Sequence, residues 1–201
     1  MKLFYAPGAC SLAVRIVAVE AGIQLDSESV DLREKRTASG QDYLRVNAKG
    51  FVPALQLEDG AVLTEGPVVM QYLADLKPES GLAPRPGTMG RYRLMEMLGY
   101  LNSEIHKTYS PLFYSTTPES IRAERKSVLQ SRYAIVESRL AQHPWLVSEE
   151  FTVADAYLFT LTNWAAHVGV DLIAFPALQA FQRRVAARPA VQTALRAEGL
   201  A

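Results

Sequence analysis

The side chain best suited to chemistry in this sequence is its single cysteine, Cys10. It stands in Pro7-Gly8-Ala9-Cys10-Ser11, between a short apolar run at residues 2–5 and a helix expected over residues 11–21. The unpaired N–H groups and the positive dipole end of a helix start favour a thiolate, so this position predicts a reactive thiol. The alternative is that Cys10 is only a small buried apolar side chain, as lone cysteines usually are. A dithiol mechanism is excluded, because it needs a second cysteine where the sequence has Ala13.

Two further segments carry groups that could hold a small peptide. A cis bond between Val52 and Pro53 would turn the backbone N–H and C=O of Val52 towards a ligand, where they could pair with it as an added strand does. Glu65 could take an ammonium group, and the N–H of Gly66, at the start of the next expected helix, can hold a carboxylate. The alternative is that Thr64 or Glu65 only caps that helix. Together with Cys10, these groups indicate a recognition surface for a small zwitterionic thiol peptide.

The composition and the missing motifs exclude several other classes of protein. The 201 residues carry 21 basic and 21 acidic side chains, and a net charge of zero lacks the electrostatic footprint of a general nucleic-acid-binding protein. The three histidines have no metal-ligand spacing, so we expect no metal. The N-terminal segment lacks the apolar run of a signal peptide, and the apolar residues 156–175 carry too many polar groups to cross a membrane. We therefore expect a cytoplasmic protein whose partners include neither a membrane nor a nucleic acid.

The elements that must position these groups fall into two parts. The first 77 residues alternate short apolar runs with helical stretches in the order β-α-β, a loop with a short helix, and β-β-α. Within this part, Asp59-Gly60 between two apolar runs predicts a hairpin. Residues 77–90 contain three prolines and three glycines and form the expected linker. Because the periodicity is helical from Arg91 onward, we predict an α/β domain over residues 1–80 and an all-helical domain over residues 81–201.

His106 belongs to the helix that is expected to follow this linker. The apolar side chains of that helix form one stripe through Leu94, Leu98, Leu101 and Ile105. At about 100° per residue, the small residues Gly99 and Ser103 share a different face with His106. Small residues beside a histidine make a groove, whereas a core histidine would sit among bulky side chains, and the alternative is a merely solvated side chain. His167 lies in the apolar stretch and is expected to be buried and structural.

At this point the sequence resembles a bacterial glutathione transferase of the beta class. The resemblance covers essentially the whole chain and rests on five motifs, which stand in order and at the spacing of the family. The motifs are Pro7-Gly8-Ala9-Cys10-Ser11, Val52-Pro53-Ala54-Leu55, Leu63-Thr64-Glu65-Gly66, Glu104-Ile105-His106-Lys107 and Phe151-Thr152-Val153-Ala154-Asp155-Ala156-Tyr157. Each motif is weak alone, and jointly they are specific. The resemblance implies the glutathione transferase fold, with an α/β thioredoxin-like N-terminal domain, an all-α C-terminal domain and a cis Pro53, and it implies a homodimer.

The resemblance also assigns roles to residues of the first domain. Cys10 would lie beside the sulfur of glutathione, and Val52 would hold the cysteinyl backbone of glutathione. Glu65 would take the γ-glutamyl ammonium of glutathione, and Gly66 its carboxylate. Lys35 would reach the glycyl end. For Lys35 the alternative is a solvated charge within the charged run at residues 33–36.

Residues of the helical domain receive their roles in the same way. His106 would face the thiol, so that Cys10 and His106 are the two catalytic residues. Ser103 and Glu104 would contact glutathione across the dimer interface. Family members often carry Asn where this chain has Gly99, and a contact made there is lost or passes to water because Gly99 has no side chain. We expect this departure to affect the strength of glutathione binding rather than its existence.

The resemblance therefore implies a detoxifying enzyme that conjugates glutathione, its co-substrate, to small hydrophobic electrophiles. The electrophile pocket would be lined by Tyr5, Ala6, Tyr109, Phe113, Tyr114 and Trp164. Cys10 would permit a second mode through a mixed disulfide, which gives thiol transfer, peroxide reduction or reductive dehalogenation. Two alternatives stay open at this point: a non-catalytic protein that binds glutathione or hydrophobic ligands, and a monothiol redox protein. Glutathione-dependent turnover of a chloronitroaromatic compound would separate the three.

Overall fold

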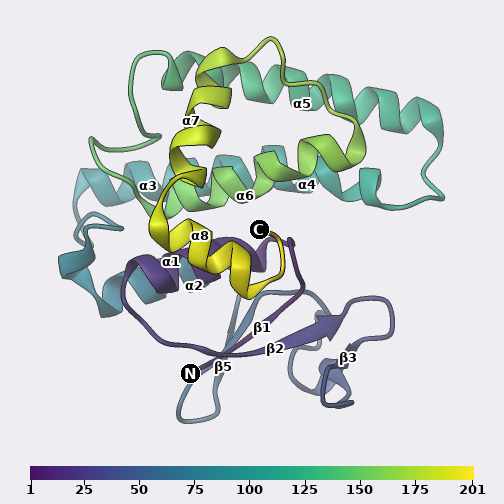
Figure 1. Ribbon diagram of the computed structural model, residues 1–201, viewed down its shortest axis with the longest axis vertical. Helices are drawn as coiled ribbons and strands as arrows, with labels where there is room; N and C mark the ends of the chain where they lie inside the picture. The colour runs from purple at the N-terminus through teal and green to yellow at the C-terminus, as the bar shows by residue number, and fades with distance from the viewer. The chain divides into compact units, whose positions relative to one another are not determined.

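The computed structural model describes every residue from Met1 to Ala201, and the chain divides into two compact units. The first unit comprises residues 1–83 together with residues 187–201, and the second comprises residues 84–186 (Figure 1). The boundary after residue 83 lies inside the segment predicted as the linker. The sequence predicted that residues 187–201 belong to the helical domain. In the structure the helix they form packs on the first unit instead.

The first unit is built on a five-stranded sheet in the order β3-β2-β1-β4-β5. Its strands are β1 (Lys2–Tyr5), β2 (Asp26–Asp31), β3 (Arg36–Thr37), β4 (Ala54–Gln56) and β5 (Val62–Thr64). Strand β1 runs parallel to β2 and antiparallel to β4, where Leu3 lies opposite Leu55, and β4 and β5 form the hairpin that Asp59-Gly60 predicts. Leu3 and Leu55 are fully buried. This sheet confirms the predicted thioredoxin-like fold class, and only the two-residue strand β3 had no sequence signal.

Three α-helices complete the first unit, α1 (Ser11–Glu20), α2 (Gly66–Leu76) and α8 (Pro189–Ala197), together with two 3₁₀ turns, η1 (Tyr43–Arg45) and η2 (Pro78–Ser80). Figure 1 shows α8 (yellow) beside α1 (purple). Every side chain of α1 from Ser11 to Ala18 is buried, because α1 packs against β1, α2 and α8. Helix α1 stops just before Gly22, whose positive φ of 66° lets the N–H of Ile23 turn back to the carbonyl of Ala18 at 2.8 Å.

The end of the chain is tied to the loop that precedes Cys10. The carboxylate of Glu198 accepts hydrogen bonds from the N–H of Gly8 at 2.9 Å and from Nε of Arg15 at 3.0 Å. Burial raises the pKa of Glu198, while Gly8 and Arg15 oppose the rise. A second ion pair joins Arg188, which precedes α8, to Glu20 at the end of α1, with 2.6 Å between Nε and Oε1. The last helix therefore supports the element that carries Cys10.

The second unit contains only helices. They are α3 (Met89–Tyr100), a π-helical segment η3 (Leu101–His106), α4 (Lys107–Tyr109), a 3₁₀ turn η4 (Ser110–Phe113), α5 (Glu119–Leu140), α6 (Val153–Val168) and α7 (Pro176–Ala186). The predicted apolar stripe from Leu94 to Ile105 is buried. Helix α6 begins at a capping box formed by Thr152 and Asp155. None of the helices combines the length and apolar character needed to cross a membrane.

One histidine was placed wrongly from the sequence. His167 lies in the last turn of α6, where its side chain is exposed rather than buried. The apolar run of α6 is buried over most of its length, but the helix ends at Gly169 in a left-handed conformation. A histidine in the last turn can therefore face solvent there.

Candidate functional site

Cys10 is held at the start of α1 with its thiol directed at the backbone of Val52. Cys10 is the N-cap residue of α1, and its Sγ donates a hydrogen bond to the carbonyl of Val52 at 3.1 Å. The segments around Cys10 and Val52 are distant in sequence and were predicted to form one recognition surface. The hydrogen bond between them shows that they are in contact. The peptide bond between Val52 and Pro53 is cis, as the resemblance to beta-class enzymes implied.

The protonation of Cys10 differs from the prediction. Burial raises the pKa of the Cys10 thiol to about 12, although the backbone N–H groups of Cys10 and Ser11 act in the opposite direction, and the negative charge of Glu65 adds to the rise. Cys10 is only partly buried. The raised pKa favours the protonated thiol. The expectation that the helix start makes Cys10 a thiolate is therefore wrong for the ligand-free chain, because burial outweighs the helix N–H groups.

The loop before Val52 is fixed by two side chains of the first unit. Both Tyr43 Oη and Asn47 Nδ2 donate to the carbonyl of Phe51, at 2.8 and 2.7 Å. Lys35 donates from Nζ to the carbonyl of Gly50 at 2.8 Å and lies 5.3 Å from the centroid of the Phe51 ring. The alternative of a freely solvated Lys35 is therefore excluded. Its ammonium group lies beside the loop that leads to Val52.

Glu65 occupies the corner between β5 and α2. Its φ is +70°, a left-handed backbone region that a residue with a side chain rarely adopts, and its side chain makes no capping hydrogen bond. Instead, Glu65 Oε1 lies 2.6 Å from Nζ of Lys49, which also contacts Thr64 Oγ1 at 3.0 Å. The alternative that Glu65 merely caps the helix is therefore wrong. Its exposed carboxylate already holds an ammonium group, the same chemistry that the γ-glutamyl end of glutathione would offer.

Gly66 begins α2 directly behind the cis proline. A Cβ at Gly66 would lie 3.8 Å from the ring of Pro53, an ordinary contact, and the backbone of Gly66 is buried. The first N–H groups of a helix have no intrahelical partner and can therefore hold an anion. The first unit thus brings Cys10, Val52 and Gly66 together around Pro53, as the sequence predicts.

The second unit places His106 at the end of the π-helical segment. Nδ1 of His106 lies 2.6 Å from the hydroxyl oxygen of Tyr157, and the Tyr157 hydroxyl donates to Oδ1 of Asn102 at 3.0 Å. The His106 ring also packs edge-on to Trp164, with 4.9 Å between the ring centroids. The alternative of a merely solvated His106 is thus excluded. Because η3 is π-helical, the rotation of 100° per residue used to place its face does not hold across this segment.

The other predicted residues of this unit lie close to His106 along the chain. Ser103 Oγ donates to the carbonyl of Gly99 at 3.0 Å, and a Cβ at Gly99 would meet nothing within 4 Å. Glu104 forms an ion pair with Arg132 of α5, with 2.7 Å between Oε2 and Nε. π-helical turns inside α-helices are frequent at functional sites, which agrees with the position of these residues.

Among the residues that hold the predicted ones in place, sequence reasoning missed Lys49, Asn102 and Tyr157. A tyrosine in the middle of an apolar helix needs a partner for its hydroxyl, and this signal could have directed attention to Tyr157. Lys49 and Asn102 carried no comparable signal, because their partners are distant in sequence or depend on the π-helical register.

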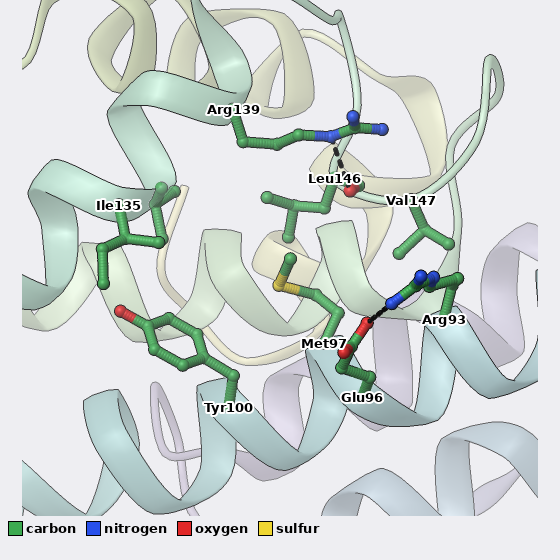
Figure 2. Close-up of a pocket in the computed structure, with 9 residues that line it drawn as sticks. Arg93, Glu96, Met97, Tyr100, Ile135, Arg139, Leu146 and Val147 are labelled. Carbon is green, nitrogen blue, oxygen red and sulfur yellow. Dashed lines mark hydrogen bonds and ion pairs between the residues drawn. The ribbon is translucent and has the colours of Figure 1, made fainter.

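Figure 2 shows a cavity of about 340 Å³ between α3, α5 and the segment at residues 146–147. Met97 and Tyr100 line it from α3, and Ile135 and Arg139 from α5. Arg139 donates from Nε to the carbonyl of Leu146 at 3.0 Å at one side of the cavity. None of the predicted catalytic, glutathione-binding or electrophile-binding residues lines this cavity.

A thioredoxin-like unit with one cysteine at its first helix and a cis proline before β4, together with an all-helical unit, is the architecture of the glutathione transferase fold. Comparisons with known proteins agree. Residues 8–76 match the glutathione S-transferase N-terminal domain, and residues 98–189 match the glutathione S-transferase C-terminal domain. The chain belongs to the glutathione S-transferase family and, within it, to the bacterial beta class.

Relatives resemble the chain over its whole length. Glutathione S-transferase GstA of Escherichia coli O157:H7 is 46% identical, and the match covers 100% of both chains. A solved structure described as a ternary complex of BphK, a bacterial glutathione transferase, is 49% identical with a TM-score of 0.98, and a sphingomonad glutathione S-transferase complexed with glutathione is 45% identical with a TM-score of 0.96. Each structure covers 100% of this chain and is itself covered to 100%. The chain is accordingly a glutathione transferase enzyme.

Proposed function

We propose that this enzyme conjugates glutathione to small hydrophobic electrophiles, with Cys10 and His106 as catalytic residues. The observation that carries the proposal is the hydrogen bond of 3.1 Å from the Cys10 thiol to the carbonyl of Val52. The cysteinyl N–H of glutathione would donate to that carbonyl in place of the thiol. The released S–H of Cys10, protonated because its pKa is raised, would then donate to the sulfur of glutathione and favour its thiolate form.

The remaining contacts to glutathione follow from the charges at the site. Glu65 holds the γ-glutamyl ammonium in exchange for Lys49, and this exchange costs little because both partners are more than half exposed. The N–H of Gly66 at the start of α2 holds the adjacent carboxylate, since Pro67 has no N–H and Val68 donates to the carbonyl of Glu65. Lys35 pairs with the glycyl carboxylate. The bound ligand is thus fixed at both charged ends, with its sulfur placed at Cys10.

His106 accepts the proton of the glutathione thiol in this mechanism. The S–H bond breaks, the thiolate attacks the carbon that carries the leaving group, and a chloride ion departs when the electrophile is a chloroaromatic. The aromatic cluster around His106 supports a hydrophobic electrophile. Trp164 lies 5.4 Å from Phe113 and 5.6 Å from Tyr109 between ring centroids, and Phe113 is half exposed.

The decisive experiment is a glutathione-dependent assay with a chloronitroaromatic substrate, together with calorimetric titration of glutathione. We expect saturable turnover, and a fall in kcat of about 100-fold in His106→Gln, because a general base typically contributes about 10²–10⁴-fold. Glutathione binding without turnover would instead establish the non-catalytic binding protein. Disulfide reduction without conjugation would establish the monothiol redox protein.

A homodimer completes the proposed site. Helix α3 exposes Met89, Tyr92 and Met95 at spacings of three residues, and their exposed fractions of 69%, 56% and 48% are large for apolar side chains. Such a face is typical of an interface between protein chains. Ser103 and Glu104 would then contact the glutathione bound to the partner. Light scattering is expected to give twice the mass of one chain, and a monomer would contradict the roles of Ser103 and Glu104.

The cytoplasm is the proposed location of this enzyme, because the lone thiol of Cys10 suits a reducing compartment.

The Gly99→Asn variant is expected to bind glutathione more tightly than the unmodified chain. Space for the side chain is open, because a Cβ at Gly99 would meet nothing within 4 Å. One additional hydrogen bond is worth about 0.5–1.5 kcal/mol, which lowers KM for glutathione roughly 2- to 10-fold. The Gly99→Ala variant is the control, because it shares the gain in helix propensity without the amide. Equal KM values in the two variants would show that the position makes no contact with glutathione.

The Glu65→Gly variant is expected to weaken glutathione binding while it stabilises the protein. Glycine adopts the positive φ of 70° without steric strain, which favours folding by about 0.5–1 kcal/mol once its larger chain entropy is counted. Loss of the carboxylate removes a charge-assisted hydrogen bond to the ammonium of glutathione, and KM rises about 10-fold or more. The Glu65→Gln control keeps the strained backbone, so it should lose affinity without gaining stability in urea unfolding. A stability gain in both variants would contradict the backbone argument.

A further inference from the structure

The peptide group between Phe51 and Val52 presents its two polar atoms in opposite directions. This peptide bond is trans, since the cis bond of the chain is the next one, between Val52 and Pro53. In a planar trans peptide the C=O and the N–H point to opposite sides. The direction of the Phe51 carbonyl therefore determines where the Val52 N–H points.

Two buried side chains hold the Phe51 carbonyl. Tyr43 Oη and Asn47 Nδ2 donate to it at 2.8 and 2.7 Å, and the two residues are 0% and 6% exposed. The direction of both bonds is fixed, because a carbonyl oxygen only accepts and because Oδ1 of Asn47 accepts from the N–H of Lys49 at 3.1 Å. Burial raises the pKa of Tyr43 to about 12, so its hydroxyl keeps its hydrogen at neutral pH.

The scaffold behind that carbonyl is rigid. Tyr43 begins the turn η1, and the N–H of Asn47 donates to the Tyr43 carbonyl at 2.9 Å, so the two donors belong to one backbone unit. The Tyr43 ring packs against Phe4 of β1, with 5.7 Å between the ring centroids, in a core cluster that also contains Val52. Two donors use both lone pairs of the Phe51 carbonyl oxygen and so fix the plane of this peptide group.

The N–H of Val52 is left as an unpaired donor at the candidate site. Val52 is 7% exposed, and its N–H makes no hydrogen bond within the chain, whereas its carbonyl accepts from the Cys10 thiol at 3.1 Å. Polar backbone groups of buried residues are rarely left unpaired, because the missing hydrogen bond is costly. This N–H is therefore suited to an acceptor that a ligand brings.

We propose that Tyr43 and Asn47 are positioning residues that direct the Val52 N–H at the cysteinyl carbonyl of glutathione. The proposal rests on the proposed function, in which Val52 holds the cysteinyl backbone. Without the two donors the peptide group before Val52 can rotate and turn its carbonyl towards the ligand. Two carbonyl oxygens then face each other, and no donor meets the carbonyl of glutathione.

The test measures how much the cysteinyl carbonyl contributes to binding in each variant. Calorimetry compares glutathione with an isostere in which a trans alkene replaces the Cys–Gly amide, so that the shape is kept and this oxygen is removed. The unmodified enzyme should bind glutathione about 5-fold more tightly than the isostere, as expected for one hydrogen bond. The ratio should decrease in Tyr43→Phe and in Asn47→Ala and approach 1 in the double variant, which loses affinity for glutathione but not for the isostere.

Thr37→Val is the matched control. It removes a buried hydroxyl of the same unit, which accepts from the N–H of Gln41 at 3.2 Å, and it should leave the ratio unchanged. A merely structural role of the two donors would weaken the binding of both ligands equally. An unchanged ratio in the double variant, or equal affinities of the two ligands for the unmodified enzyme, would overturn the proposal. Failure of the proposed function would appear separately, as the absence of glutathione binding and turnover in the unmodified enzyme.

Discussion

Treatment of the protein with glutathione disulfide is expected to convert Cys10 into a mixed disulfide with glutathione, and the Cys10→Ala variant is expected to form no such adduct. In this reaction the Cys10 thiolate attacks one sulfur of the disulfide, a new S–S bond forms and the old one breaks. The departing glutathione thiolate takes up the proton that Cys10 has lost. Because Cys10 is the single cysteine of the chain, intact mass with and without a reductant measures the adduct directly.

The rate of adduct formation should depend steeply on pH. Burial raises the pKa of the Cys10 thiol to about 12, so the reactive thiolate is a small fraction of the ligand-free protein at neutral pH. Below that pKa the thiolate fraction rises about tenfold per pH unit, and the initial rate should follow it between about pH 7 and about pH 9. A rate that does not change over this range would indicate a thiolate already formed at neutral pH, against the burial argument.

Two variants separate the covalent mode of Cys10 from conjugation. Disulfide exchange should fall to background in both Cys10→Ala and Cys10→Ser, because neither side chain can form a disulfide. Conjugation should persist in both variants, since His106 still accepts the proton of glutathione, and it should be higher in Cys10→Ser, which keeps a donor beside Val52. Full disulfide-exchange activity in Cys10→Ala would rule out a covalent role for Cys10.

The sequence predicts most of the fold because local patterns determine most of its elements. Helix α1 follows from its apolar periodicity and from Gly22, and the hairpin follows from Asp59-Gly60, since these signals act over a few residues. The attachment of α8 could not be predicted in this way. It depends on Glu198 meeting Gly8 and Arg15, contacts that join the two ends of the chain and have no local signature.

The candidate site shows the same division between local and distant causes. The positions of Cys10 and Gly66 at helix starts are local features, and the structure places both as predicted. The direction of the Cys10 pKa was missed, because it results from a balance between burial and helix N–H groups that only the packed structure determines. Similarly, the α-helical rotation used for His106 fails because η3 takes a π-helical register, to which the sequence gives no clue.

The Asp155→Ala variant is expected to produce the largest loss of stability, about 3 kcal/mol near pH 5. Asp155 is fully buried at the start of α6. Its Oδ2 accepts hydrogen bonds from the N–H and the hydroxyl of Thr152 at 2.8 and 2.9 Å, and its Oδ1 accepts from the N–H of Leu146 at 2.9 Å. Truncation leaves these buried donors without their acceptor, and each unpaired donor costs about 1–3 kcal/mol, partly relieved by water entry.

Asp171→Ala provides the matched control for this variant. Asp171 also accepts a backbone hydrogen bond, from the N–H of Ile173 at 2.8 Å, but its side chain is exposed. Water replaces the lost acceptor there, so the free energy of unfolding should change by less than about 1 kcal/mol. Urea unfolding followed by the fluorescence of the two tryptophans measures both variants. Equal losses in the two variants would show that burial of the Asp155 hydrogen bonds contributes nothing.

The pH dependence of the loss identifies the buried carboxyl as its source. Burial raises the pKa of Asp155 to about 6 from an unfolded value of 3.8, although the hydrogen bonds from Leu146 and Thr152 oppose the rise. Between these values the folded protein binds more protons than the unfolded chain, so the stability contributed by Asp155 is fully present below about pH 4 and decreases as the pH rises through 6. The loss caused by Asp155→Ala should therefore be smaller near pH 8 than near pH 5, by about 1.4 kcal/mol. Comparison of the variant with the unmodified protein cancels the titration of all other groups, including Glu198. A loss that grows with pH would mean that the hydrogen bonds stabilise the carboxylate more than burial opposes it.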